Sequence, residues 1–201
     1  MGIVQLSNTK IKNSLIRWFD NATIDDMLNG VSWYDEPQKF AKETASNYCL
    51  DRYTVAGIIS ALSPNNKWER NKIDTIAVIE ASMYGASPDS VKVCTYNNNK
   101  LKAFRIMKGF DIITEQSPKT HSFAMNIGLL SPAHVTIDKW HLRACQCNPC
   151  DDPTNTLQET CSPLQYRRIE RITAELAKKY GYTGYQFQAI IWCAIKRTWN
   201  R

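Results

Sequence analysis

The sequence contains no apolar run that approaches the roughly 20 residues needed by a membrane-spanning helix. Its first residues, MGIVQLSNTKIKNS, also lack the apolar core of a secretory signal peptide. These two absences exclude an integral membrane protein. They predict an intracellular, cytoplasmic location.

Segments that alternate polar and apolar residues like a strand are almost missing, and no two of them are joined by a hairpin turn. The short segment HVTI, residues 134–137, is the exception. The chain also lacks internal repeats and low-complexity tracts. Since 201 residues can bury a core without metal or disulfide crosslinks, the sequence predicts one all-α domain, a multi-helix bundle over residues 1–201.

Five Ser-Pro pairs indicate helix starts. Serine is a favoured N-cap because its hydroxyl accepts a hydrogen bond from an unpaired N–H, and proline suits the first helical position because it has no N–H. The pairs are Ser63-Pro64, Ser87-Pro88, Ser117-Pro118, Ser131-Pro132 and Ser162-Pro163. Further helices are predicted around residues 10–19, 36–48, 51–62, 99–108, 118–128, 138–146 and 184–198.

The net charge of +6 is unevenly distributed along the chain. Residues 1–66 carry six Lys/Arg against seven Asp/Glu, residues 67–138 nine against seven, and residues 139–201 ten against five. The positive field therefore grows toward the C-terminal part, which suits a polyanion such as nucleic acid. The basic segment at residues 166–181 either follows a phosphate backbone or forms the solvated face of an amphipathic helix.

Seven cysteines, an odd number, argue against a fully paired disulfide framework. Four of them share the spacing C-x-C-x2-C-x10-C, namely Cys145, Cys147, Cys150 and Cys161. Four thiolates are enough ligands for a zinc ion or an iron-sulfur cluster. Free thiols are the alternative, and nothing else in the sequence requires a cofactor.

Two residues at predicted helix starts carry candidate chemistry. Lys119 follows Ser117-Pro118 in a first helical turn, where the helix dipole favours anions. A bound phosphate would justify a lysine there, as would an amine that loses its proton and acts as a nucleophile, while a solvated lysine is the structural alternative. Asp138 has the position of an N-cap, and its carboxylate could also stabilise a cation or accept a proton.

The order of these elements resembles the helix-hairpin-helix DNA glycosylase superfamily, which includes endonuclease III and 8-oxoguanine DNA glycosylase. The matching elements are a helix at 99–108, a hairpin at 109–118, Lys119 directly after it and, beyond a short extended link, Asp138. The resemblance implies that the hairpin amides contact a DNA phosphate, that Lys119 attacks the sugar C1′ and that Asp138 assists departure of the base. It also implies two helical lobes that flank a cleft.

The segment AGIISALSPNNKWERNKIDTIAVIEA, residues 56–81, is similar to the family's early helix and the Leu-Ser-containing turn that ends it. In the family, a polar side chain of this turn helps to fill the gap left by the flipped base, which makes Asn65 or Asn66 the candidate here. A helix-capping turn with solvated asparagines is the alternative. Segments similar to ALSPNNKW and TIDKW also occur in small phage-borne proteins, and a phage origin would make the host cytoplasm the location.

An enzyme that flips a base needs a pocket with stacking surfaces. The candidate pocket aromatics are Trp33, Tyr34, Trp68 and Trp140, each of which could instead belong to the core. The family's histidine two places after the aspartate is replaced here by Trp140, and a histidine follows it. Other residues predicted to contact DNA or substrate are Ser117, Thr120, His141 and Arg143.

The resemblance therefore implies a monomeric enzyme that binds double-stranded DNA and hydrolyses the N-glycosidic bond of a damaged or modified base, with or without Schiff-base AP-lyase activity. Two alternatives stay open. One is a helix-hairpin-helix protein that binds DNA without catalysis, and the other is an enzyme that hypermodifies DNA bases on the same scaffold.

Overall fold

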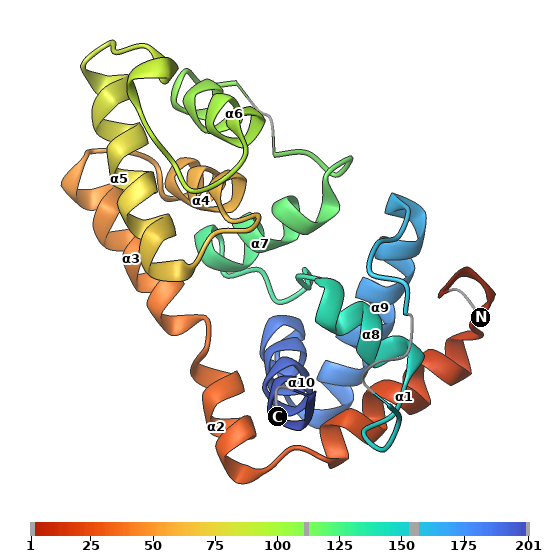
Figure 1. Cartoon of the computed structure of the whole chain (residues 1–201). Helices are drawn as coiled ribbons and strands as arrows, with labels where there is room; N and C mark the ends of the chain where they lie inside the picture. The colour runs from red at the N-terminus through yellow and green to blue at the C-terminus, as the bar shows by residue number, and fades with distance from the viewer. Residues whose placement is uncertain (1–2, 111–112, 153–156, 200–201) are drawn as a thin grey trace. The chain divides into compact units, whose positions relative to one another are not determined.

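The computed structural model describes residues 3–110, 113–152 and 157–199, which form helices joined by loops (Figure 1). No strand occurs in these ranges, so the all-α prediction is confirmed. None of their helices is long and apolar enough to cross a membrane. The helices are α1 (Asn8–Asp20), α2 (Ile24–Ser32), α3 (Asp35–Asn47), α4 (Arg52–Leu62), α5 (Trp68–Met83), α6 (Asn97–Met107), α7 (Pro118–Gly128), α8 (Lys139–Gln146), α9 (Pro163–Tyr180) and α10 (Gly184–Trp199), with the 3-10 helices η1 (Ile3–Gln5) and η2 (Pro88–Ser90).

The chain forms two compact units. The terminal unit comprises Met1–Glu36 and Ser131–Arg201, and the central unit comprises Pro37–Leu130. The central unit carries twelve Lys/Arg against eight Asp/Glu, and the terminal unit thirteen against eleven. The larger positive charge therefore belongs to the central unit, although along the sequence it grows toward the C-terminal part. The single domain with a cleft between two lobes stays a prediction.

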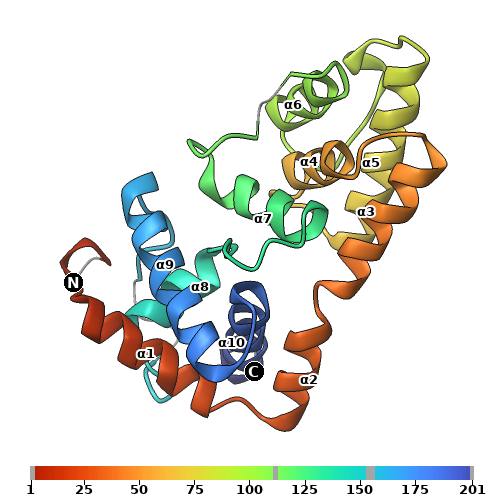
Figure 2. The same ribbon diagram turned by 180° about the vertical axis from the view of Figure 1, so that it is seen from behind.

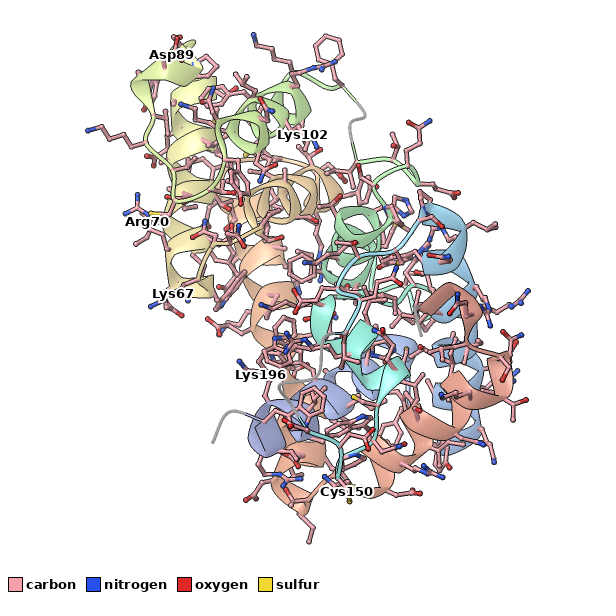
Figure 3. All side chains as sticks on the ribbon, turned by 45° about the vertical axis from the view of Figure 1, so that its right-hand side comes forward. Lys67, Arg70, Asp89, Lys102, Cys150 and Lys196 are labelled. Atoms are coloured by element: carbon pink, nitrogen blue, oxygen red, sulfur yellow. The ribbon has the colours of Figure 1, made fainter. Side chains whose placement is uncertain are left out.

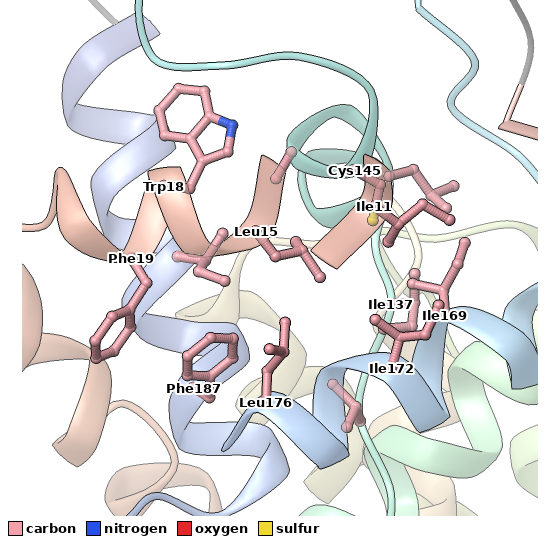
Figure 4. Packing of buried hydrophobic residues seen from close by; sticks show 14 of the residues in the cluster. Ile11, Leu15, Trp18, Phe19, Ile137, Cys145, Ile169, Ile172, Leu176 and Phe187 are labelled. Carbon is pink, nitrogen blue, oxygen red and sulfur yellow. The ribbon is translucent and has the colours of Figure 1, made fainter. Parts of the chain in front are cut away.

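The terminal unit is built around α10, which packs against α1, α2, α8 and α9. In Figure 2, α8 and α9 both lie beside α10. Apolar side chains from these helices, together with Val135 and Ile137 from the link before α8, form its core. In Figure 4, Phe19 of α1 faces Phe187 of α10, and their rings stack with centroids 4.9 Å apart. This core fixes the N-terminal helices to the C-terminal ones.

Helix α4 is the interior helix of the central unit. All residues from Val55 to Leu62 are buried, and α4 packs against α5, α6 and α7. A helix that is apolar on every side belongs in an interior. Gly128 at the end of α7 permits a close approach, because a Cβ at this position would lie 2.8 Å from the Ala56 Cβ.

Two of the five Ser-Pro pairs begin an α-helix, those of α7 and α9. The predicted helix starts are wrong at residues 63–64 and 131–132, which lie in turns, and at 87–88, which begins only the short η2. Ser63 is the C-cap of α4, and its hydroxyl donates to the Ser60 carbonyl at 2.9 Å. A Ser-Pro pair suits a turn as well as a helix start, since proline fixes only φ.

Helix α2 was not predicted. It begins with a capping box in which Thr23 Oγ1 accepts from the Asp26 amide at 3.2 Å and Asp26 Oδ2 accepts from the Thr23 amide at 2.9 Å. Arg197 at the end of α10 donates to the same carboxylate at 2.7 Å. The Thr-x-x-Asp pattern was the signal available in the sequence. The segment at 134–137 is in no helix and pairs with no strand in the described ranges.

The helix-hairpin-helix element stays a prediction. Helices α6 and α7 are present at the expected positions. The hairpin predicted between them at 109–118 includes residues 111–112, which lie outside the described part of the chain.

Gly30 of α2 generates a prediction about packing in the terminal unit. A Cβ at this position would lie 2.5 Å from both Cα and N of Ile190 on α10. We predict that Gly30→Ala lowers the free energy of unfolding by about 2 to 3 kcal/mol, because the two helices must move apart. Urea denaturation followed by circular dichroism measures the change. Asn29→Ala, on the exposed face of α2, is the control, and equal stability of both variants would contradict the close packing.

Candidate functional site

Lys119 lies in the first turn of α7 with an exposed side chain. This turn is attached to α4, because the Thr120 carbonyl accepts a hydrogen bond from Ser60 Oγ at 2.6 Å. Ser117 does not cap α7 with its hydroxyl, so that part of the prediction is wrong. Its φ of −113° and ψ of 66° depart from the extended conformation of a capping residue. Lys119 therefore lies in a helix turn that Ser60 holds in place, although the Ser117 hydroxyl does not cap it.

Asp138 is the N-cap of α8, and its Oδ1 accepts from the His141 amide at 2.9 Å. Its carboxylate is half-buried. The link before it is held by α9, because the Tyr166 hydroxyl accepts from the Ile137 amide at 2.9 Å and donates to the Val135 carbonyl at 2.8 Å. Asp138 is thus positioned by hydrogen bonds on both sides.

Tyr34 brings a buried hydroxyl near Asp138. The hydroxyl is hydrogen-bonded to Thr136 and donates to Gln188 Oε1 at 3.3 Å, while the ring packs against Tyr185 at a centroid distance of 5.0 Å. Burial raises the pKa of Tyr34 well above its ordinary value, and the charge of Asp138 raises it further. The hydroxyl therefore keeps its proton. Because Tyr34 is only 2% exposed, it is a core aromatic, which was the alternative to a stacking role.

Trp140, half-buried in the first turn of α8, is surrounded by cations. Lys196 Nζ lies 4.7 Å, Arg143 Cζ 4.9 Å and Lys139 Nζ 5.5 Å from centroids of its ring system. Lys196 projects from α10 (Figure 3) and lies 5.8 Å from the ring of Trp192. Cations are attracted to an aromatic face. We call this group the tryptophan-cation cluster; it offers both positive charge and an aromatic surface.

The sequence had not identified Trp192 and Lys196 as members of this cluster. Their spacing of four residues on a predicted helix was the available signal. Trp33 is 38% exposed and lies 6.1 Å from Trp192, which extends the aromatic surface. The guanidinium of Arg143 also pairs with Glu159.

His141 is 1% exposed, so its predicted contact with DNA is wrong. Its Nε2 lies 2.9 Å from Thr173 Oγ1, and that hydroxyl donates to the Ile169 carbonyl at 2.9 Å. Nε2 therefore donates to Thr173. Burial lowers the pKa of His141 to about 3. The physical reason is helical geometry, since each residue turns by about 100° and the position after Trp140 faces the core.

A buried carboxylate holds the LSPNN turn at residues 62–66. Asp74 of α5 is fully buried and accepts from Asn66 Nδ2 at 2.9 Å, Arg70 Nε at 2.7 Å and the Cys94 amide at 2.8 Å. Asn66 is thereby engaged within the fold. Arg70 lies at the surface (Figure 3), so the carboxylate is neutralised from outside.

Asn65 is the exposed asparagine of the turn. It has a left-handed φ of 56°, and its Nδ2 donates to the Tyr96 hydroxyl at 2.6 Å. Trp68, half-buried at the start of α5, packs edge-on against Phe40 at 5.8 Å, and its buried Nε1 has no hydrogen-bond partner among the described residues. Asn65 therefore stays the candidate to fill the gap left by a flipped base.

The four cysteines have different environments. Cys145 is part of the terminal core (Figure 4), Cys147 donates to a carbonyl of α8 at 2.9 Å, Cys150 is exposed (Figure 3) and Cys161 is half-buried. Within the described ranges, no three His, Cys, Asp or Glu side chains are placed to hold a metal ion. Burial raises the pKa of Cys147 to about 12 and also that of Cys145, which disfavours thiolates. The loop residues 153–156 lie outside the description, and a metal site stays a prediction.

The candidate residues fall into two groups. The central unit holds Lys119 with Ser117 and Thr120, and it also holds the turn at residues 65–68. The terminal unit holds Asp138 with the tryptophan-cation cluster. Because Lys119 and Asp138 belong to different units, their shared site stays a prediction.

The fold and these sites define an all-α protein of two helical units with a capped aspartate beside a basic aromatic surface. The chain belongs to the Family of unknown function (DUF7178), whose model matches residues 2–199. No curated protein and no solved structure matches the chain.

The buried His141 generates a prediction about pH. Its pKa falls from 6.5 to about 3 on folding, so below pH 6.5 the unfolded chain binds a proton that the folded chain excludes. As the pH falls below 6.5, the free energy of unfolding therefore decreases by about 1.4 kcal/mol per pH unit, which amounts to about 2 kcal/mol at pH 5. Denaturant titrations at pH 7 and pH 5 measure this loss. His141→Gln keeps a donor toward Thr173 and should lose less stability than the wild type between pH 7 and pH 5. An identical pH dependence of the two proteins would contradict the assignment of this loss to His141.

The cysteines generate a prediction about thiol reactivity. Cys49, Cys94 and Cys150 are exposed, so we expect them to react rapidly with a disulfide reagent in the native protein. Cys145 should react only after unfolding, because it is buried. Cys150→Ser should remove one rapidly reacting thiol. A metal bound by the four cysteines predicts the opposite, with Cys150 protected and zinc or iron found by elemental analysis.

Proposed function

We propose that this protein is a DNA glycosylase that hydrolyses the N-glycosidic bond of a damaged or modified base. The observation that carries the proposal is that Lys119 and Asp138 each open a helix, α7 and α8, with neither side chain in a core. These are the positions at which the resembled superfamily has its catalytic lysine and aspartate.

Asp138 is the group suited to the developing positive charge on the sugar. As the base departs with the electron pair of the C1′–N bond, the sugar becomes oxocarbenium-like, and a fixed carboxylate stabilises it. The capping bond to the His141 amide and the hold of Tyr166 on the preceding link keep the carboxylate in place. A preorganised charge costs no reorganisation during the reaction.

Lys119 has two roles consistent with its exposed position. As a neutral amine it would attack C1′ and form a Schiff base after the base has left, which permits strand cleavage. As a protonated amine it would bind a DNA phosphate beside the N-terminus of α7, and water would be the nucleophile. The attachment of Thr120 to Ser60 fixes the turn in either case.

The tryptophan-cation cluster supports DNA as the partner. Lys139, Arg143 and Lys196 surround Trp140, and such a surface can contact phosphates and stack on an unpaired base. The same observation favours the second candidate function, a protein that binds DNA without catalysis. The two candidates differ only in whether a base is released.

The catalytic proposal is tested with Asp138→Asn. Asparagine is as good an N-cap as aspartate, so α8 should persist while the negative charge is lost. We expect release of bases, measured by mass spectrometry on duplexes with natural, damaged and hypermodified bases, to fall by about 100-fold or more. DNA binding should be retained. If the wild-type protein releases no base from any of these duplexes, the binding function is the better description.

The role of Lys119 is tested by borohydride trapping on the same DNAs. A Schiff base would be reduced to a stable covalent complex, and Lys119→Ala should abolish it. Lys42→Ala, an exposed lysine of α3, is the matched control. Undiminished trapping of Lys119→Ala would exclude Lys119 as the nucleophile. If the wild type forms no trapped complex and Lys119→Ala binds DNA more weakly than the wild type, Lys119 is assigned to phosphate binding.

A further inference from the structure

The central unit contains a pocket of about 190 Å³ between α4 and α6, which includes Gly109, Phe110 and Ile113 of the segment predicted as a hairpin but neither Lys119 nor the LSPNN turn. Its lining is mainly apolar and aromatic, and comprises Tyr53, Thr54, Gly57, Ile106, Phe110 and Ile113, with Gly109. A cavity of about 150 Å³ in a protein core is large enough for one benzene ring. The pocket therefore has room for one planar ring system.

Gly57 forms part of the pocket wall in the middle of the buried helix α4. Glycine in a helix interior is destabilising relative to alanine. A Cβ at Gly57 would lie 3.5 Å from Ile106 Cγ2 and 3.6 Å from Ile113 Cγ1, which are ordinary van der Waals distances. Packing within the protein therefore does not require glycine here. At Gly30, by contrast, packing excludes any larger residue.

The glycine at position 57 leaves part of the pocket volume free. A methyl group would project into the pocket beside two isoleucines and reduce its volume. The sequence thus has glycine, which is unfavourable in a helix interior, at a position where a methyl group would narrow the pocket.

Cations line the outer side of α6, the second helix of the pocket. A groove of about 530 Å³ beside α6 is lined by Lys102, Arg105 and Lys108 together with Asn98 and apolar residues. Figure 3 labels Lys102 on α6. Arg105 Cζ lies 5.5 Å from the ring centroid of Phe110, so one residue of the groove contacts one residue of the pocket. None of the three cations has an ion pair within the described part of the chain.

We propose that this pocket binds one unpaired nucleobase of a DNA strand whose phosphates lie on Lys102, Arg105 and Lys108. Phe110 is 55% exposed at the pocket and provides a face for stacking, while Thr54 offers a hydroxyl to the base edge. Nucleic acid is the polymer in which planar rings and anionic groups alternate at short spacing, so it matches an apolar pocket beside cations. The proposal rests on the DNA-binding part of the proposed function and not on catalysis by Lys119 or Asp138.

The test uses the full-length protein and two fluorescein-labelled single-stranded oligodeoxynucleotides of equal length, one with bases and one in which several positions are abasic. Fluorescence anisotropy measures both affinities. The wild type should prefer the strand with bases by about tenfold, as expected for a stacked base. Gly57→Ala should remove this preference, while its thermal midpoint stays equal or rises because alanine favours the helix.

Arg105→Gln tests the phosphate contacts. It should weaken binding of both strands and reduce the slope of affinity against salt by about one counterion. Lys42→Gln, an exposed cation of α3, is the matched control and should change neither. The pocket assignment is overturned if Gly57→Ala keeps the wild-type preference for bases, or if the wild type binds both strands equally.

The outcome is separable from the fate of the glycosylase proposal. Asp138→Asn should retain the preference for bases, since Asp138 belongs to the other unit. A protein that releases no base but loses its base preference with Gly57→Ala would support the pocket and reject the glycosylase. The reverse result would reject the pocket alone.

Discussion

The buried helix α4 is the constraint on which the central unit depends. Ser60 fixes the first turn of α7, and with it Lys119, through the Thr120 carbonyl. The same helix accepts a hydrogen bond from Asn71 Nδ2 at its Ile59 carbonyl, at 3.0 Å, which joins it to α5. Its buried glycine forms a wall of the pocket beside α6. A shift of α4 would therefore move the candidate lysine, the LSPNN turn and the pocket together.

In the terminal unit, α9 has the corresponding role. Tyr166 holds both sides of the link before α8, and Glu170 Oε1 accepts from the Val135 amide at 3.0 Å. These buried bonds satisfy backbone polar groups of a link that belongs to no helix and, within the described ranges, to no strand, and that would otherwise leave those groups unpaired in a core. They also determine where Asp138 begins α8. Tyr34, whose pKa burial raises well above its ordinary value, adds a buried hydroxyl near the carboxylate.

The elements that were predictable are those with a local cause. The apolar periodicity and the caps gave α4, α7, α9 and α10 within a few residues, and the N-cap position of Asp138 followed from an aspartate between an apolar link and a helix. Helix α2 was missed although its Thr-x-x-Asp capping box was visible. Ser-Pro pairs were misleading where the chain turns instead of continuing as a helix, because the local preference is the same in both cases.

The sequence by itself determined that the protein is helical, where its main helices lie and which residues open them, because these depend on contacts within a few positions. The tertiary structure alone decided that His141 faces the core while its neighbour Trp140 meets Lys196 from a helix more than fifty residues away. It also decided that net charge favours the central unit. These outcomes depend on which distant segments pack together, and burial then sets which side chains reach solvent and which ionisable groups keep their charge.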